Sequence, residues 1–182
     1  MRISIDFGIT VTDSLKKSSN GSLEHKMVLS NSEPSENLVR NIFPELNFTE
    51  DLEHIAVTGG KHGNIGDHIN NTPVFHINEV DAIGEGAMHL SGIEKNKSSI
   101  IVSAGSGTAC IYAKDGKYLH CSGTGVGGGT VLGLSKLLLN TIDPKEIGEL
   151  ASRGDPRATD LIIEDVVSGP IGELPPETTA VN

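Results

Sequence analysis

Glycine is the residue type whose placement in this sequence points most directly to chemistry. Nine of the 22 glycines lie between Gly105 and Gly133. Glycine adopts positive φ readily and lets backbone N–H groups come close to a ligand, most often a phosphate. We therefore expect phosphate contacts in this part of the chain, although a glycine loop that merely turns the chain would show the same pattern.

Two glycine-rich stretches in this region each follow a predicted strand. They are Gly105-Ser106-Gly107-Thr108 and Gly123-Thr124-Gly125-Val126-Gly127-Gly128-Gly129-Thr130. The second stretch also opens a predicted helix, whose N–H groups and dipole favour an anion. It fits the dinucleotide pattern GxGxxG by letter, but the acidic residue that closes the following strand in that motif is missing, as is the lysine of a P-loop. The stretches indicate a phosphate site of another kind.

Two acidic positions are candidates for the rest of the chemistry. Asp6 ends the first predicted strand beside a glycine turn, a place that suits a ligand of magnesium-bound water; it could also be an Asx residue that forms the turn. Glu79 and Asp81 flank a strand-to-helix junction, where a carboxylate can point into a cleft and take a proton from a substrate hydroxyl. The alternative for both is ordinary negative charge at a helix start.

Composition excludes several classes of function. The chain has 182 residues, with 24 acidic against 14 basic side chains and a net charge of -10. This charge disfavours nucleic acid and anionic membranes, and the 3% of aromatic residues leaves no stacking platform for bases. No apolar run is long enough for a membrane span or a signal peptide, so we expect a cytoplasmic protein. Cys110 and Cys121 are predicted to be small buried thiols.

Short strands and helices must position these residues. A hairpin is predicted where Ile3–Phe7 meets Thr10–Thr12, and a helix with Ser32 as a possible cap is predicted to end near Pro44. Two Asp-Pro pairs, Asp143-Pro144 and Asp155-Pro156, predict helix starts. The other predicted strands are about His25–Leu29, His54–Gly59, Val74–Ile77, Ile100–Ala104, Thr108–Ala113 and Tyr118–Cys121, with helices from about Glu79 and after the second glycine stretch, and a surface tail over 168–182.

The two halves of the chain resemble each other. Each begins with an apolar strand that runs into a glycine turn, followed by a return strand and later a helix. We therefore predict a duplicated β-β-β-α unit, with an N-terminal half over 1–91 and a C-terminal half over 92–182. Such a pair can grip a phosphate chain between two hairpin turns.

Five stretches, read in order, resemble the type II, eukaryotic-like pantothenate kinase family of the acetate and sugar kinase, heat-shock and actin superfamily. They are Ile5-Asp6-Phe7-Gly8-Ile9-Thr10, Val57-Thr58-Gly59-Gly60, the nine residues from Asn78 to Gly86, the seven from Val102 to Thr108 and the thirteen from Ser122 to Leu134. The resemblance implies an α/β fold of duplicated ribonuclease H-like (actin-like ATPase) halves around an interdomain nucleotide cleft, with a second half shorter than in the family.

The family transfers the γ-phosphoryl group of ATP to the terminal hydroxyl of pantothenate, giving 4'-phosphopantothenate in the first step of coenzyme A synthesis. The resemblance therefore implies ATP and Mg²⁺ as cofactors, pantothenate as substrate and a homodimer. It implies Glu79 as the general base and Asp6 as the residue that positions magnesium. The residues implied for phosphate or nucleotide binding are Asp6, Gly8, Thr10, Gly105, Ser106, Gly107, Thr108, Gly127, Gly128 and Gly129, and those for the substrate are Ser103, Ser106, Thr108 and His120.

The sequence also departs from the family. Ile9 and Asp13 stand where the family has a paired glycine and a lysine, and His120 would have to serve for an arginine that binds the substrate. A carboxylate near the phosphates would repel them, and a neutral imidazole is a weaker anion partner than a guanidinium. Two alternatives therefore stay open. One is a pseudokinase that binds nucleotide or acyl-coenzyme A, and the other is a different superfamily member, such as a sugar kinase or a dehydratase activator.

Overall fold

The structure is a computed structural model that describes residues 1–46, 52–169 and 171–181. The chain packs as two compact units, 1–131 and 132–182. The predicted halves, 1–91 and 92–182, follow the repeated strand order instead and stay a prediction. No helix in the described part of the chain is long and apolar enough to cross a membrane.

A six-stranded sheet forms the first part of unit 1–131. Its strands are β1 (Arg2–Phe7), β2 (Val11–Lys17), β3 (Leu23–Leu29), β4 (His54–Gly59), β5 (His68–Ile69) and β6 (Thr72–His76), in the order β3-β2-β1-β4-β6-β5. β1 pairs antiparallel with β2 and parallel with β4, so the predicted first hairpin is confirmed. The register sets Asp6 opposite Asp13 on one side and Thr58 on the other.

The hydrophobic core lies on one face of this sheet. Side chains alternate along β1, so Ile3, Ile5 and Phe7 are buried while Ser4 and Asp6 point to the opposite face. Helix α1 (Glu36–Ile42) covers the buried face with Val39 and Ile42. Its cap is Ser35, whose hydroxyl accepts from the N–H of Leu38 at 3.2 Å, rather than the predicted Ser32. Ser35 directly precedes the first helical residue, which is where capping geometry requires the oxygen.

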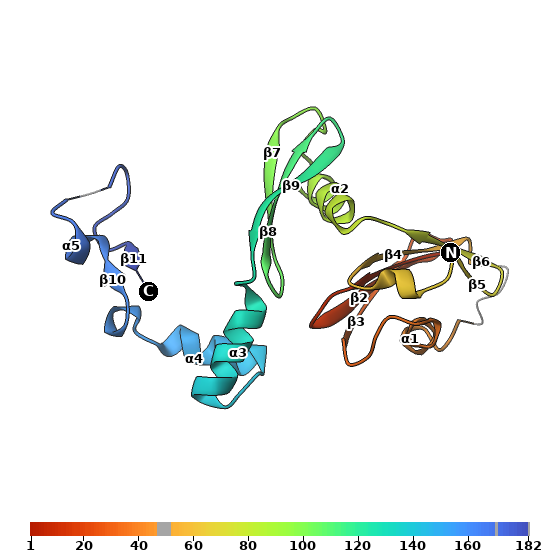
Figure 1. The fold of residues 1–182 in the computed structure, drawn as a ribbon, viewed down its shortest axis with the longest axis horizontal. Coiled ribbons are helices and arrows are strands. Elements are labelled where there is room, and N and C mark those ends of the chain that lie inside the picture. Colours follow the sequence, from red (N-terminus) through yellow and green to blue (C-terminus); the bar gives the residue numbers. More distant parts are fainter. Residues whose placement is uncertain (47–51, 170, 182) are drawn as a thin grey trace. The chain divides into compact units, whose positions relative to one another are not determined.

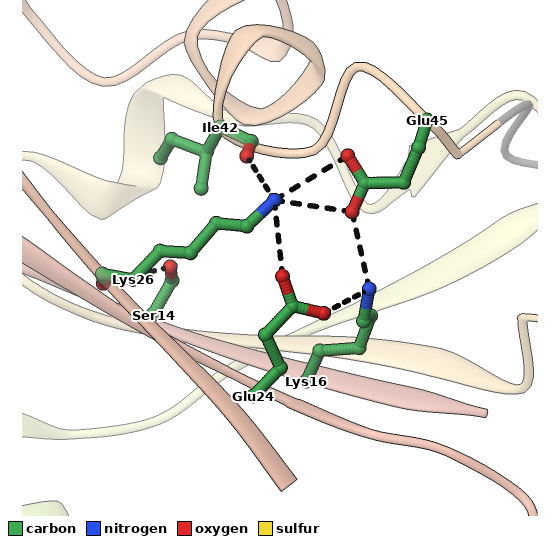
Figure 2. Close-up of polar contacts among 6 residues, drawn as sticks. All are labelled: Ser14, Lys16, Glu24, Lys26, Ile42 and Glu45. Atoms are coloured by element: carbon green, nitrogen blue, oxygen red, sulfur yellow. Dashed lines mark hydrogen bonds and ion pairs between the residues drawn. The ribbon is translucent and has the colours of Figure 1, made fainter.

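The far end of α1 is held down by a charged network (Figure 2). Lys26 donates to the carbonyl of Ile42 at 3.2 Å, satisfying one of the carbonyls that a helix end leaves free, and it also pairs with Glu45 at 3.1 Å. Lys16 pairs with Glu45 as well, and both lysines lie over the ring of Phe43. A backbone hydrogen bond together with the two lysines lowers the pKa of Glu45 to about 2. The network therefore keeps its charges well into the acid range.

Helix α2 (Glu79–Ser91) begins where the sequence predicts, because the Asn78 side chain accepts from the N–H of Val80 at 2.9 Å. It packs against a second sheet, also within unit 1–131, made of β7 (Ser99–Ala104), β8 (Thr108–Lys114) and β9 (Lys117–Thr124) (Figure 1). This sheet is an antiparallel meander. A bulge in β9 lies beside Cys110. Cys121 is exposed and Cys110 is only half-buried, so the prediction that both thiols are buried is wrong.

Helix α3 (Gly128–Leu139) follows the second sheet and leads into unit 132–182. This unit contains α4 (Pro144–Arg153), α5 (Ile163–Val166) and the antiparallel pair β10 (Leu161–Ile162) and β11 (Thr179–Val181). Asp143 caps α4 as predicted, accepting from the N–H of Lys145 at 2.8 Å. The second predicted helix start, Asp155-Pro156, produces only a 3₁₀ turn, Pro156–Ala158. The succession β1-β2-β3-α1 is repeated as β7-β8-β9-α3.

The core can be tested with one buried and one exposed isoleucine. Ile55 is 0% exposed and Ile9 is 84% exposed. We expect Ile55→Ala to lower the free energy of unfolding by about 2–5 kcal/mol, because it removes buried methyl groups and leaves a cavity. Ile9→Ala removes the same atoms and should change it by less than about 0.5 kcal/mol. Urea unfolding followed by circular dichroism measures both, and equal effects would contradict the described packing.

Candidate functional site

Two of the residues singled out from the sequence, Asp6 and Glu79, line one pocket. It has a volume of about 330 Å³ and lies on the open face of the six-stranded sheet, bounded by β1 to β4 and the start of α2. Asp13, His25 and Thr58 also line it. The sequence predicts a role for each of the two carboxylates separately, and the structure brings them together.

The position of Asp6 depends on a glycine in the neighbouring strand. Gly59 has φ of +84°, and a Cβ there would lie 2.4 Å from Oδ1 of Asp6 and 2.6 Å from the carbonyl of Phe7. Only glycine leaves room for the carboxylate at this point. The sequence identifies the Val57–Gly60 stretch but assigns no role to Gly59. The position of Gly59 at the end of a predicted strand was the signal that could have identified it.

The electrostatics of the pocket are dominated by its carboxylates. Asp6 keeps an exposed edge, yet partial burial raises the pKa of its carboxyl, and the negative charges of Glu79 and Asp13 raise that pKa further. His25 stands against Asp13, with Nε2 2.8 Å from Oδ1. A protonated His25 would offset the charge of Asp13, the residue whose carboxylate the sequence analysis expects to repel phosphates. His25 could not be identified from the sequence, because its pairing with Asp13 depends on the register of β2 and β3.

The two turns predicted to hold phosphates meet through their hydroxyls. Thr10 Oγ1 and Ser106 Oγ lie 2.8 Å apart and share a hydrogen bond between residues 96 positions apart. The first turn is tight, since a Cβ on Gly8 would lie 2.4 Å from the carbonyl oxygen of Val11. It is also braced by Ser30, whose hydroxyl donates to the carbonyl of Gly8 at 2.7 Å. The turns that join β1 to β2 and β7 to β8 therefore lie side by side.

The second glycine stretch packs on the Gly105–Thr108 turn, backbone against backbone. The N–H of Gly128 donates to the carbonyl of Gly105 at 2.8 Å, and the N–H of Gly129 donates to that of Ser106 at 3.1 Å. A Cβ on Gly127 would lie 2.8 Å from atoms of Gly107. The sequence predicts that N–H groups at the start of α3 bind an anion. In the structure, two of them donate to protein carbonyls instead.

The residues expected to bind substrate are more dispersed. Ser103 lies in β7 opposite Ala109, and the Thr108 hydroxyl donates to the carbonyl of Val126 at 2.8 Å. His120 is exposed in β9, with its ring beside Gly123, where a Cβ would lie 3.2 Å from Nε2. Among the described residues that line the pocket of Asp6 and Glu79, neither Ser103 nor His120 occurs. Their roles stay a prediction.

Comparison with known proteins finds similar sequences among the pantothenate kinases. The chain is 30% identical over 134 residues to a type II pantothenate kinase of Bacillus cereus, covering 72% of this chain and 49% of that protein. It is 29% identical to a type II pantothenate kinase of Staphylococcus epidermidis over 184 residues, covering 100% of this chain and 66% of that protein. The Fumble family model matches residues 94–181. The chain is therefore similar in sequence to type II pantothenate kinases. It spans about half the length of the Bacillus cereus relatives that it matches.

Solved structures of low sequence identity share the fold. Component A of the (R)-2-hydroxyglutaryl-CoA dehydratase of Acidaminococcus fermentans superposes with a TM-score of 0.62 at 13% identity, over 89% of this chain and 61% of that one. A ROK family glucokinase of Streptomyces griseus, solved with glucose and AMPPNP, gives 0.60 at 14%, over 86% and 72%. The fold is the α/β fold of duplicated ribonuclease H-like, actin-like ATPase units that the sequence predicts.

The charge of Asp6 should make the stability of the protein depend on pH. Because its pKa is raised in the folded state, the ionised carboxylate destabilises the fold above that pKa, and this cost disappears as the pH falls toward 3.8. We expect Asp6→Asn to raise the free energy of unfolding at pH 7 by less than about 1 kcal/mol, since water screens an exposed carboxylate, and to gain less at pH 4.5. Urea unfolding at the two pH values measures the difference. Glu94→Gln, at an exposed site, is the control; an equal gain there, or a loss in Asp6→Asn, would count against the described electrostatics.

Proposed function

We propose that this chain carries out the ATP-dependent phosphorylation of pantothenate to 4'-phosphopantothenate. The observation that carries the proposal is the shared pocket of Asp6 and Glu79. In this pocket, Asp6 would position the metal ion and Glu79 would accept the proton. Phosphoryl transfer asks a protein mainly for positioning, charge neutralisation and an oriented nucleophile. The names of the related pantothenate kinases supply the substrate.

Glu79 is the proposed general base. It is the first residue of α2, and the Asn78 cap holds the backbone of that helix turn in place. Its carboxylate lines the pocket, where it can accept the proton of the pantothenate hydroxyl as the oxygen attacks the γ-phosphorus. Asp81, two residues further on, lines a different pocket with Tyr118. The sequence does not decide between these two acidic residues. Because Glu79 lines the pocket of Asp6, the pocket favours Glu79 as the base.

Asp6 is the residue that we propose for magnesium. The donor set fits this ion, because Mg²⁺ is usually held by one or two carboxylates, several waters and the phosphates of its substrate rather than by a full protein cage. The described residues contain no group of three or more His, Cys, Asp or Glu side chains that could hold a metal alone. Bound Mg²⁺ would neutralise charge on the phosphates, and Asp6 would orient its water shell.

The turns at Gly8–Thr10 and Gly105–Thr108 are the proposed phosphate contacts. Their support is the hydrogen bond between the Thr10 and Ser106 hydroxyls, which sets the two turns beside each other. Gly127, Gly128 and Gly129 would hold the second turn in position and close the loop over the nucleotide. Ser103, Ser106, Thr108 and His120 remain the proposed substrate contacts. A homodimer is proposed from the family resemblance, halves at 1–91 and 92–182 from the repeated strand order, and a cytoplasmic location from the sequence.

A second candidate function is nucleotide binding without turnover. Two observations favour it: the Asp13 carboxylate in the pocket, and the engagement of the Gly128 and Gly129 N–H groups by protein carbonyls. Both reduce the attraction of the site for a phosphate chain. The same assay separates the two candidates.

The test is mass-spectrometric detection of 4'-phosphopantothenate from this chain with MgATP and pantothenate. We expect product from the unaltered chain. Glu79→Gln should lower kcat by roughly 10²- to 10⁴-fold, the usual contribution of a general base, while nucleotide affinity is kept. Asp81→Asn, on the same helix turn, is the matched control and should retain most of the activity.

The other outcomes each decide something. Nucleotide binding by the folded chain without any product would overturn the kinase proposal in favour of the second candidate. Loss of activity in Asp81→Asn with retention in Glu79→Gln would show that Asp81, and not Glu79, is the base. Absence of both binding and product from the folded chain would contradict both candidates.

A further inference from the structure

Tyr118 lies directly against the backbone of α2. Gly84 is buried, and a Cβ at this position would lie 2.2 Å from Cδ1 of Tyr118 and 2.3 Å from its Cγ. The ring therefore occupies the space that any other residue at position 84 would fill. At its far end the tyrosine hydroxyl donates to Oε2 of Glu85 at 2.6 Å. One side chain of β9 thus holds two consecutive residues of the helix.

A second connection joins the same two elements. Lys95, beyond the end of α2, pairs with the other carboxylate oxygen of Glu85 at 2.5 Å. The carbonyl of Lys95 accepts from the N–H of Asp115 at 2.6 Å, in the turn between β8 and β9. Glu85 is therefore held from both sides by groups tied to the β8–β9 hairpin.

The contact keeps its protonation over a wide pH range. The hydrogen bonds from Lys95 and Tyr118 lower the pKa of Glu85, and the hydrogen bond to Glu85 raises the pKa of Tyr118 to about 12. Glu85 is thus ionised and Tyr118 neutral in any ordinary buffer. The arrangement is a fixed mechanical link rather than a pH switch.

The two ends of this link lead to the two parts of the candidate site. Glu79 begins α2, five residues before Gly84, which is about 7.5 Å along a helix. A hydrogen-bonded helix moves as one piece, so a tilt at Gly84 displaces Glu79. On the other side, β9 runs from Tyr118 to Thr124 and directly into the loop that packs on the Gly105–Thr108 turn.

We propose that Tyr118 is a positioning residue: its ring on Gly84 and its hydroxyl on Glu85 fix α2 on the β8–β9 hairpin and so set where Glu79 stands relative to the glycine turns. Tyr118 does not line the pocket of Asp6 and Glu79 within the described residues, so it acts through the helix. The inference rests on the proposed kinase function of that site.

Two glycines of the same helix provide a matched test. Gly84→Ala forces the Tyr118 ring to move, whereas Gly86→Ala makes the same chemical change where a Cβ meets nothing within 4 Å. We expect Gly84→Ala to lower kcat roughly 10- to 100-fold with little change in KM, because small misplacements of a catalytic group are costly. Gly86→Ala should stay within about twofold. Equal effects of the two, or a change confined to KM, would overturn the proposal.

A double-variant cycle shows whether the effect passes through the tyrosine. In a Tyr118→Ala background the ring is gone, so adding Gly84→Ala should cost almost nothing further. Full additivity of the two losses would contradict the proposed link. If Gly84→Ala does not fold, Tyr118→Phe keeps the ring and removes only the hydroxyl. We expect it to lower kcat by about threefold or more without changing KM, as loss of a hydrogen bond to a charged group predicts; an unchanged kcat would overturn the role of the hydroxyl.

A structural readout separates failure of this inference from failure of the proposed function. Hydrogen–deuterium exchange at the first turn of α2 needs no catalytic activity. We expect faster exchange there in Tyr118→Phe and Gly84→Ala, and unchanged exchange in Gly86→Ala. If the unaltered chain makes no product but exchange changes in this way, the link stands and the kinase proposal fails. Unchanged exchange in both Tyr118→Phe and Gly84→Ala would overturn the link itself.

Discussion

The Gly105–Thr108 turn and the loop that opens α3 touch backbone to backbone, and this contact exists only because its crossing points are glycine. A Cβ on Gly107 would lie 2.8 Å from the carbonyl oxygen of Thr124, and one on Gly129 would lie 2.9 Å from that of Ser106. A clash of this kind cannot be relieved by rotating a side chain, because the atoms on the other side belong to the main chain. The contact fixes Ser106, whose hydroxyl then meets Thr10. The adjacency of the two turns therefore depends on these glycines.

The charges in the pocket impose a second constraint. Asp6, Asp13 and Glu79 bring three carboxylates to one cavity, with His25 as the nearby imidazole. Such a site repels a bare polyphosphate, so attraction has to come from the N–H groups of the turns and from a divalent cation that the carboxylates favour. Burial, and then the negative charges of Glu79 and Asp13, raise the pKa of Asp6, so its ionised form is disfavoured without a cation. A magnesium–nucleotide complex meets both requirements, which is why the electrostatics and the proposed chemistry agree.

Local signals in the sequence predicted the elements that local interactions determine. The alternation along β1 and the Asn78 cap before Glu79 both appear where the residues indicate. The two Asp-Pro pairs show the limit of such signals. Asp143-Pro144 starts a helix, but the segment after Asp155-Pro156 soon pairs as β10 with β11, some twenty residues away, and this long-range pairing overrides the local preference.

Contacts between distant segments were beyond the reach of sequence reasoning for the same reason. Asp6 and Glu79 were each identified, yet only the sheet register and the start of α2 show that they share a pocket. From the sequence, the N–H groups of Gly128 and Gly129 are expected to contact a phosphate. In the structure they donate to carbonyls more than twenty residues earlier in the chain, and local signals do not reveal such partners.

The account rests on the two turns acting together on one phosphate chain. A ¹H–¹⁵N NMR titration of this chain with MgAMPPNP tests that directly. The account predicts that the amide signals of residues 8–10 and 105–108 shift together with one apparent dissociation constant. Shifts confined to one turn, or saturating shifts only at residues outside both turns, would contradict it.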